Sequence, residues 1–306
     1  MKIGTLGVLA SCLLLAACGG AGDSLVTTTP PPPPPPPATP LPLVATSTFP
    51  TITSTMSYNE PYGGPSSFDT LRSDARSTTI SFSYDAATGT YSVTGNGVSA
   101  SFGQGDQIAD TTYNDTFSKT AGTVADSIKL YGNARADTPG TPPVVLSYTS
   151  FGVWTHSDST TGKSSKAYFL YGQPTGTTMP TTGTASYEMT AAAHAYPGGI
   201  GTSTTRITGT ATLNANFATG SVDTTLKLGG TFTGTGKISG DQFAGTFNTN
   251  DPSALTGQFN GGFFGPGAKE AGFTFQIHQH VADPYAGASV QPMDTYIAGA
   301  AAGPKG

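Results

Sequence analysis

The sequence predicts an all-β fold, with at most a minor helix, arranged as an antiparallel barrel or sandwich of hairpins. Charged residues make up only 10% of the chain and glycine supplies 41 of its 306 residues, a composition that favours strands and turns. Stretches such as 78–84 and 208–217 alternate roughly between polar and apolar residues, as half-buried strands do. Turn-forming residues separate such stretches at 85–89, 95–97, 239–241 and 248–252.

The first 17 residues predict a cleavable signal peptide. Lys2 provides a positive start, and the uncharged, mostly apolar run from Ile3 to Ala17 ends in small residues, as signal-peptidase sites require. The run is shorter than the roughly 20 apolar residues of a transmembrane helix, and no later segment approaches that length. We therefore expect residues 1–17 to be removed and the mature chain to cross no membrane as a helix.

Cys18 is the predicted site of lipid attachment. The segment Leu15-Ala16-Ala17-Cys18-Gly19 resembles the lipobox of bacterial lipoproteins, in which the cysteine thiol is acylated before cleavage. An ordinary secretory signal with a chance cysteine is the alternative. The other cysteine, Cys12, lies in the part that is removed, so the mature chain has no intramolecular disulfide and Cys18 is free for lipid. The resemblance implies a lipid anchor in the bacterial outer membrane, with display at the cell surface.

A proline-rich spacer follows the anchor. Eight prolines run without interruption from Pro30 to Pro37, and at about 3.1 Å per residue they extend about 25 Å. A ligand for a proline-recognition domain is the alternative, but we interpret residues 18–45 as the lipidated N-terminus and a semi-rigid stalk. We expect a β-rich domain at 46–176, a barrel at 177–285 and a flexible tail at 286–306, because the tail is rich in glycine and alanine.

Two details of the folded part are expected from local sequence. The segment 116–130 is looser than its neighbours and predicts a short helix around 124–130. Glycines within the predicted strands fit the bulges and bends that a small barrel needs to close; they are Gly209, Gly234, Gly236, Gly245 and Gly257.

Charge and motif content argue against nucleic acid and against catalysis. Cleavage before Cys18 removes 17 of the 306 residues and one lysine, which leaves 12 basic and 18 acidic residues, a formal charge of −6. Such a chain lacks the basic face that a nucleic-acid partner requires. No nucleophile elbow occurs, and the segment 234–238 fails the phosphate-loop pattern and reads as a strand. Acidic residues do not cluster as catalytic pairs, so we expect no catalytic residues, no resident cofactor and a binding protein rather than an enzyme.

Three segments of the second half resemble the barrel of transferrin-binding protein B. Residues 261–275 contain the family's run of aromatic, Gly-Pro, Ala, Glu and Gly residues, 179–187 resembles the start of that barrel, and 211–222 resembles its next hairpin. The family usually has paired glycines after the glutamate, and here the second is Phe273. The residues that carry the resemblance, for which a structural role is expected, are Met179, Pro180, Gly183, Tyr187, Phe263, Phe264, Gly265, Pro266, Glu270 and Gly272.

This resemblance implies a closed eight-stranded barrel preceded by a β-rich handle domain, to whose strands residues 150–154 and 169–172 are similar. It also implies a surface lipoprotein that captures an iron source without catalysis, near an outer-membrane transporter. The chain has room for one lobe, so it looks more like relatives that bind haem, haem proteins or complement regulators than like a two-lobed transferrin receptor. A structural or envelope-interaction lipoprotein with the same barrel is the alternative.

Aromatic and histidine residues near the end of the predicted barrel give the remaining expectations. We expect Phe263, Phe264, Phe273 and Phe275 to fill or cover the barrel, with an aromatic ligand cage as the alternative. His278 and His280 are two residues apart and would share one face of a strand, where two imidazoles could bind a metal or haem iron. Polar residues at an exposed strand end are the competing interpretation of this pair.

Overall fold

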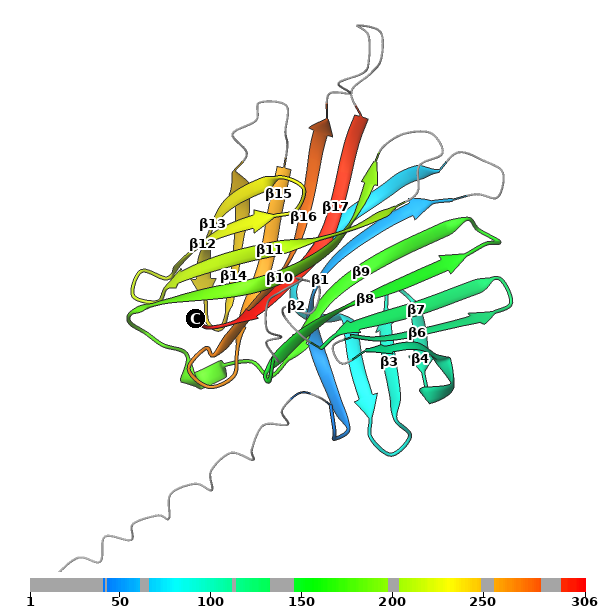
Figure 1. The fold of residues 1–306 in the computed structure, drawn as a ribbon, viewed down its shortest axis with the longest axis horizontal. Coiled ribbons are helices and arrows are strands. Elements are labelled where there is room, and N and C mark those ends of the chain that lie inside the picture. The colour runs from blue at the N-terminus through cyan, green and yellow to red at the C-terminus, as the bar shows by residue number, and fades with distance from the viewer. Residues whose placement is uncertain are drawn as a thin grey trace, which may run out of the picture. The chain divides into compact units, whose positions relative to one another are not determined.

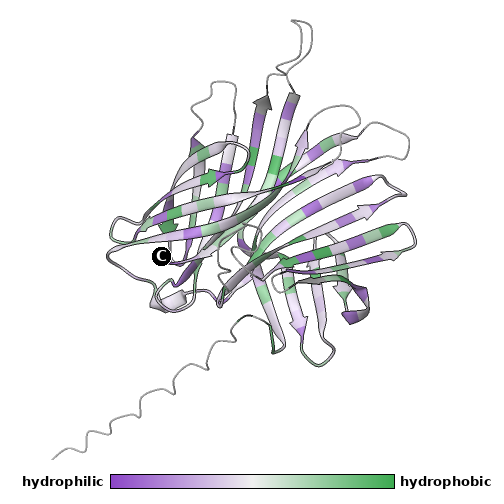
Figure 2. Cartoon of the chain, viewed as in Figure 1, coloured by the Kyte–Doolittle hydropathy of each residue, from purple (hydrophilic) through white to green (hydrophobic). Residues whose placement is uncertain are grey.

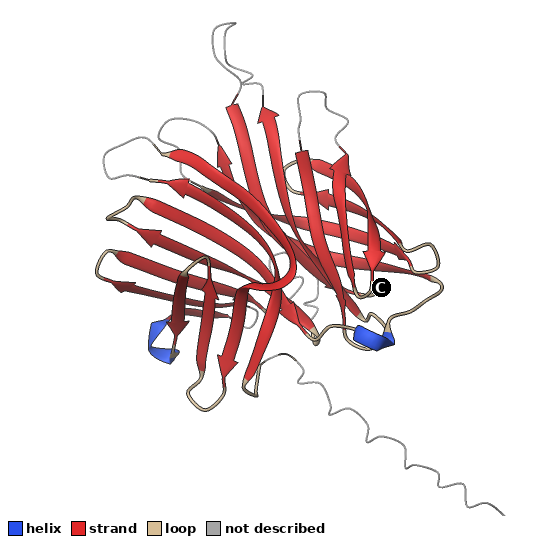
Figure 3. Cartoon of the chain, turned by 180° about the vertical axis from the view of Figure 1, so that it is seen from behind, coloured by secondary structure: helices blue, strands red, loops and turns tan. Residues whose placement is uncertain are grey.

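The structure is a computed structural model that describes residues 41, 43–60, 66–111, 114–132, 146–197, 204–248, 256–281 and 293–306. The all-β prediction is confirmed, because the helical content of these residues is two short 3₁₀ turns, η1 (Gln104–Asp106) and η2 (Gly176–Thr178), as Figure 3 shows. Neither turn approaches the length or apolarity that crossing a membrane as a helix demands. The predicted signal peptide, Cys18 and the polyproline run lie outside the described residues.

The first half of the described chain forms a nine-stranded antiparallel sheet, which we call the handle. Its strands follow the order β4-β3-β2-β1-β9-β8-β7-β6-β5, so the sheet has β4 and β5 at its two edges. Figure 1 shows the sheet curling on itself. The strands are β1 (Ser47–Asn59), β2 (Ser67–Asp85), β3 (Thr90–Gly95), β4 (Val98–Phe102), β5 (Gln107–Thr111), β6 (Asn114–Ala121), β7 (Val124–Tyr131), β8 (Thr149–Asp158) and β9 (Lys163–Gly172).

The short helix expected around 124–130 is wrong. These residues form β7, which pairs with both β6 and β8. Asp126, Ile128 and Leu130 are buried while the residues between them are half-exposed, so the period is two rather than 3.6. Ile128 and Leu130 join an aromatic core inside the curl of the handle, which also contains Phe82, Phe102, Phe117, Trp154, Phe169 and Tyr171.

The second half forms a closed eight-stranded antiparallel barrel, as the resemblance implied. Figure 2 shows hydrophilic and hydrophobic positions alternating along many of its strands. Its interior is filled mainly by phenylalanines, including Phe243, Phe247, Phe259, Phe273 and Phe275. The strands are β10 (Thr184–Pro197), β11 (Thr205–Asn216), β12 (Ser221–Lys227), β13 (Thr231–Ser239), β14 (Gln242–Asn248), β15 (Thr256–Phe264), β16 (Glu270–Val281) and β17 (Met293–Pro304).

The prediction of a flexible tail at 286–306 is wrong for the part that the structure describes. Residues 293–304 form β17, which pairs with β16 and β10 and closes the barrel (Figure 1). Close packing on both faces of β17 explains why many of its residues are small. A Cβ at Gly299 would lie 2.4 Å from the ring of Phe275, whereas Ala298 and Ala300 face the handle with no exposed surface. A run of small residues can therefore be a tightly packed strand.

The barrel glycines do not mark bulges. The described ladders between barrel strands run without a register shift from β10 to β17. Glycine instead provides room for close approach. A Cβ at Gly245 would lie 2.2 Å from the Thr235 carbonyl oxygen and 2.4 Å from the Phe259 ring. The expectation of bulges was wrong, because glycine here makes room for the neighbouring strand and for large phenylalanines.

The handle and barrel share one apolar layer and belong to one compact unit, Ala38–Gly306. Large handle side chains, among them Met56, Tyr168 and Leu170, pack on small residues of the barrel wall, among them Ala192 and Ala300. Because alternate residues of a strand face opposite sides, the same handle strands present their other face to the inside of the curl. The handle therefore has one face covered by the barrel and one face turned toward the inside of the curl, where its aromatic core lies.

The chain enters the handle earlier than expected. Leu41 and Leu43, which we assigned to the stalk, pack against the aromatic core of the handle. The backbone N–H of Leu41 donates to the carbonyl of Ser147 at 2.9 Å. The last residues of the predicted 18–45 segment thus belong to the folded part.

Candidate functional site

Glu270 fastens the barrel to the handle. Its carboxylate, at the start of β16, accepts hydrogen bonds from the backbone N–H groups of Ser147, Tyr148 and Thr149 at 2.7–2.8 Å. These three residues lie at and just before the start of β8, and Glu270 is 5% exposed. Burial raises the pKa of Glu270, while the three N–H donors and Lys269 oppose that shift. We call this contact the Glu270 latch.

The other residues of the barrel resemblance gather around the latch. Tyr187 is fully buried and donates its hydroxyl to the Ala268 carbonyl at 2.7 Å. Gly265 has φ +69°, and a Cβ there would lie 2.5 Å from the ring of Tyr148. A Cβ at Gly272 would lie 2.7 Å from Leu170 of the handle. These residues allow close packing within the barrel and between barrel and handle, and none of them lines a described pocket.

The remaining residues of the barrel resemblance also pack in the barrel or lie in its connections. Phe263 fills the barrel, whereas Phe264 lies on its outer face against the handle. Met179 packs against the barrel core, Gly183 has φ +83° just before β10, and Pro180 and Pro266 lie in the connections that precede β10 and β16. The expected filling and covering roles of the four phenylalanines are confirmed, since Phe273 and Phe275 are also in the barrel core.

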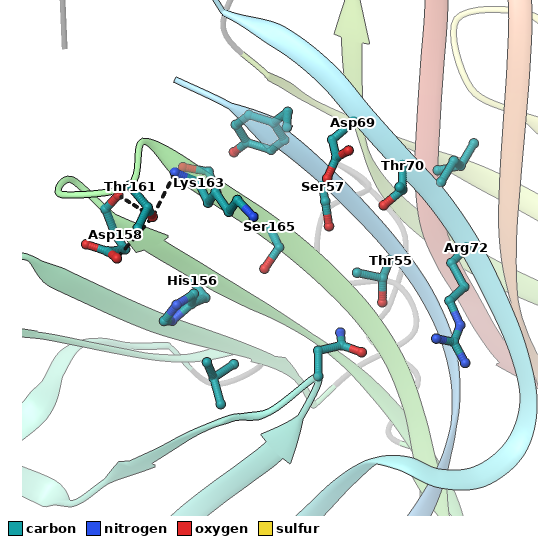
Figure 4. A pocket seen from close by; sticks show the side chains of 15 residues that line it. Thr55, Ser57, Asp69, Thr70, Arg72, His156, Asp158, Thr161, Lys163 and Ser165 are labelled. Carbon is teal, nitrogen blue, oxygen red and sulfur yellow. Dashed lines mark hydrogen bonds between the residues drawn. The ribbon is translucent and has the colours of Figure 1, made fainter. Parts of the chain in front are cut away.

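A polar hollow lies inside the curl of the handle, with a volume of about 640 Å³ (Figure 4). A row of polar residues that are neighbours across five adjacent strands runs from β7 through β8, β9 and β1 to β2. We call this the polar row: Asp126, His156, Ser165, Ser57 and Thr70. All but the buried Asp126 line the floor of the hollow. The adjoining row contains Ile128, Trp154 and Ala167, so the apolar core of the handle begins directly beside the hollow.

Asp126 fixes one end of the polar row. It is 7% exposed, and one carboxylate oxygen lies 2.9 Å from both Trp154 Nε1 and His156 Nδ1. The indole N–H donates to this oxygen, and the carboxylate favours the histidine tautomer that carries its proton on Nδ1. Within the described chain, no serine, threonine or cysteine is hydrogen-bonded to His156, so this carboxylate–imidazole pair lacks an adjacent nucleophile.

Charged residues of both signs line the walls of the hollow. Asp69 and Arg72 come from β2, whereas Asp158 and Lys163 come from the β8–β9 hairpin (Figure 4). Arg72 Nε pairs with Asp74 at 2.9 Å. The backbone N–H of Thr160 and the side chain of Thr161 lower the pKa of the exposed Asp158 carboxyl. The hollow is therefore polar but nearly balanced in charge.

His278 is placed by an aromatic stack rather than by a ligand pocket. Its ring lies nearly parallel to that of Tyr296, with centroids 4.5 Å apart, and Tyr296 stacks on Phe68 of the handle at 3.5 Å. His278 Nε2 lies 3.4 Å from Asp294 Oδ1, outside hydrogen-bond geometry, and that nitrogen is covered. The side chain of its predicted partner, His280, lies outside the described residues.

A third histidine, which sequence reasoning did not single out, lies between barrel and handle. His194 Nδ1 is 2.8 Å from the hydroxyl of Tyr168. Burial, and then the positive charges of Lys166, Arg206 and Lys129, lower the pKa of His194 to about 3. No local signal in the sequence pointed to this contact, because its partner Tyr168 lies 26 residues away on another strand.

Among the residues that the structure describes, no three His, Cys, Asp or Glu side chains come together as a metal site would require. The described residues thus form a polar hollow, a structural latch and a buried histidine whose pKa is lowered. The sequence pointed to the latch residues through the resemblance and missed the hollow, because its members lie on five separate strands and become neighbours only by strand pairing.

Residues 179–291 match the family described as the C-lobe and N-lobe β-barrels of Tf-binding protein B. This stretch runs from just before β10 to just before β17 and so covers the barrel except for its last strand. No curated protein matches the chain.

Solved structures of low identity are similar in outline. A transferrin-binding protein B variant from Haemophilus parasuis Hp5 is 14% identical with a TM-score of 0.48, covering 83% of this chain and 45% of that one. The haemoglobin receptor HpuA from Kingella denitrificans is 16% identical with a TM-score of 0.39, covering 85% and 86%. HpuA in complex with human haemoglobin gives 16% identity, a TM-score of 0.37 and coverage of 85% and 87%. The chain thus spans less than half the length of the first of these proteins.

Proposed function

We propose that this chain is a lipid-anchored capture protein of a bacterial outer membrane, which binds a protein or haem-type iron source without catalysis and serves an outer-membrane transporter. The observation that carries the proposal is the match of residues 179–291 to transferrin-binding protein B barrels, on a barrel latched to a handle. The lipobox-like sequence at Cys18 and the proline-rich spacer support display at the cell surface.

The path of the chain supports a folded part that is tethered at one end and binds its ligand at the other. Leu41 enters beside Ser147, whose N–H donates to Glu270, so the spacer joins the folded part at the latch. The described β8–β9 connection, 159–162, lies at the opposite end of β8 from the latch. Binding residues concentrate on loops carried by a rigid scaffold. We therefore place ligand contacts at the end of the folded part that is opposite the latch.

Absence of catalysis is proposed on chemical grounds. The one histidine–carboxylate pair in the hollow, His156 and Asp126, has no hydrogen-bonded nucleophile in the described chain. The backbone N–H groups of the strands around it take part in the sheet ladder, so they are not free to hold a developing oxyanion. A binding role requires neither group.

The test is binding of the full acylated chain, in detergent, to immobilised haemoglobin and to transferrin. We expect one of the two to bind with micromolar or tighter affinity, expression to rise under iron limitation, and the Cys18→Ala chain to lose membrane attachment. A chain that binds neither probe nor free haem, and whose expression ignores iron, would be the structural envelope lipoprotein of the alternative.

Haem itself is the second candidate ligand, favoured only by the spacing of His278 and His280. The covered Nε2 of His278 and its stacking on Tyr296 oppose direct iron ligation. In an absorbance titration with haem we expect no Soret shift that depends on these residues. A shift that is lost in His278→Ala/His280→Ala would assign haem ligation to the pair.

A further inference from the structure

The polar row on the floor of the hollow offers hydrogen bonds that the chain itself leaves unused. In the described structure, the side chains of Ser57, Ser165 and Thr70 make no hydrogen bond, although Ser57 and Ser165 are direct cross-strand neighbours. Elsewhere in the same sheet the equivalent cross-strand pair, Ser92 and Ser101, satisfies itself with hydroxyl oxygens 2.8 Å apart. The floor thus presents a set of neighbouring free donors and acceptors.

The walls favour a ligand without net charge. Asp69 and Lys163 face the hollow, and neither has an ion-pair partner within 4.0 Å in the described chain. A small anion would meet the Asp69 and Asp158 carboxylates, and a small cation would meet Arg72 and Lys163. A hydroxyl group both donates and accepts, so it can satisfy a carboxylate on one side and an ammonium group on the other.

Size, apolar lining and rigidity fit a compact ring. The volume of about 640 Å³ lies within the roughly 300–1,000 Å³ of small-molecule sites. Val98 supplies an apolar contact at the wall, suited to the C–H face of such a ring. The floor is held from below by the barrel, and Asp126 fixes His156 through Nδ1, which leaves Nε2 for a ligand.

From these observations we propose that the hollow of the handle binds a neutral saccharide, with the polar row reading its hydroxyl groups. Ser57 and Ser165 contact the sugar from the floor, and Asp69 and Lys163 do so from opposite walls. The site lies inside the handle and does not depend on the capture of a protein, so it gives the chain a second ligand of different chemistry.

The test uses the full chain and a panel of methyl glycosides of glucose, galactose, mannose and N-acetylglucosamine, with their disaccharides. Saturation-transfer NMR detects binding, and calorimetry measures it. The double variant Ser57→Ala/Ser165→Ala removes two hydroxyls from the floor. Thr233→Ala/Thr235→Ala is the matched control, because it removes two exposed hydroxyls from β13 on the barrel exterior.

We expect at least one saccharide to bind, the floor variant to bind it roughly tenfold or more weakly, and the control to bind as the parent does. Equal thermal stability of the three proteins shows that folding is not the cause. Three results would overturn the proposal: no saturation transfer at about 10 mM of any saccharide, unchanged affinity in the floor variant, or tighter binding of the charged probes glycine or inorganic phosphate at the same residues.

Discussion

The barrel and the handle are built from the same alternating pattern, yet they enclose different interiors. The barrel pairs its last strand with its first, and eight phenylalanines of the described chain, including Phe259 and Phe275, occupy its inside. The handle leaves β4 and β5 as edges, and its curl is apolar at one end and polar at the other. Closure around large side chains produces a scaffold whose described interior is an apolar core. Incomplete closure leaves a surface on which polar residues of five strands meet.

The two regions also differ in what they need from each other. The barrel has its own core, whereas the handle strands β1, β8 and β9 are covered on one face by barrel alanines. The single tryptophan, Trp154, lies 3% exposed in the handle core, so its fluorescence reports the handle alone. Circular dichroism reports both sheets. Together these two signals can show whether the handle is stable only on an intact barrel.

The largest effect should follow removal of residues 293–306. Without β17 the barrel has two unpaired edges and the handle loses the wall formed by Ala298, Ala300 and Ala302. We expect the truncated chain to lose its cooperative unfolding transition and Trp154 emission to shift to that of an exposed indole. Native-like Trp154 emission in the truncated chain would show that the handle folds without the barrel and would break the proposed dependence.

Gly265→Val should have the next largest effect. A β-branched residue at φ +69° costs about 1–3 kcal/mol, and the clash of its Cβ with the Tyr148 ring adds about 1–3 kcal/mol. Lys269→Ala, four residues further on, removes a cation–π contact with the same ring and a positive charge beside Glu270, and it should cost less than about 1 kcal/mol. Denaturant midpoints measure both, and equal midpoints would contradict the tight turn.

Glu270→Ala should cost about 3 kcal/mol, because three N–H groups, one buried and two part-buried, lose their acceptor. The loss falls on the contact between the two regions, so the Trp154 transition should occur at lower denaturant than the circular dichroism transition. Asp223→Ala, at an exposed position on β12, is the control and should stay within about 0.5 kcal/mol of the parent. Coincident Trp154 and circular dichroism transitions in Glu270→Ala would show that the latch does not join separable parts.

Local patterns in the sequence were sufficient to predict many strands and the barrel. They could not predict which side chains become neighbours when the strands pair. The alternation at 78–84 and 208–217 and the resemblance at 261–275 predicted elements that the structure contains. Residues 124–130 were misassigned because polar Asp126 occupies an inward position, where Trp154 and His156 satisfy it from the next strand. The glycine and alanine residues of 293–304 were misassigned because a run of small side chains is also typical of a flexible tail. Their large partners, Phe275 inside the barrel and Tyr168 on the handle, are not adjacent in the sequence.

The smallest effect is a pH dependence that separates the two regions. An unfolded histidine titrates near pH 6.5, whereas folding lowers the pKa of His194 to about 3. Between these values the unfolded chain binds a proton that the folded chain excludes, so the contribution to stability is complete above about pH 6.5 and falls as the pH falls. From pH 7 to pH 5 the parent should lose about 2 kcal/mol more than His194→Gln, at about 1.4 kcal/mol per pH unit.

Since His194 contacts Tyr168 across the boundary between barrel and handle, acid should weaken that boundary before either core. Paired urea titrations at pH 7 and pH 5, followed by Trp154 emission and by circular dichroism, measure this. In the parent, the Trp154 midpoint should fall further than the circular dichroism midpoint, and His194→Gln should remove the difference. The same loss of stability in parent and variant would mean that His194 takes up its proton in the folded protein, and the boundary would then be more hydrated than its contacts indicate.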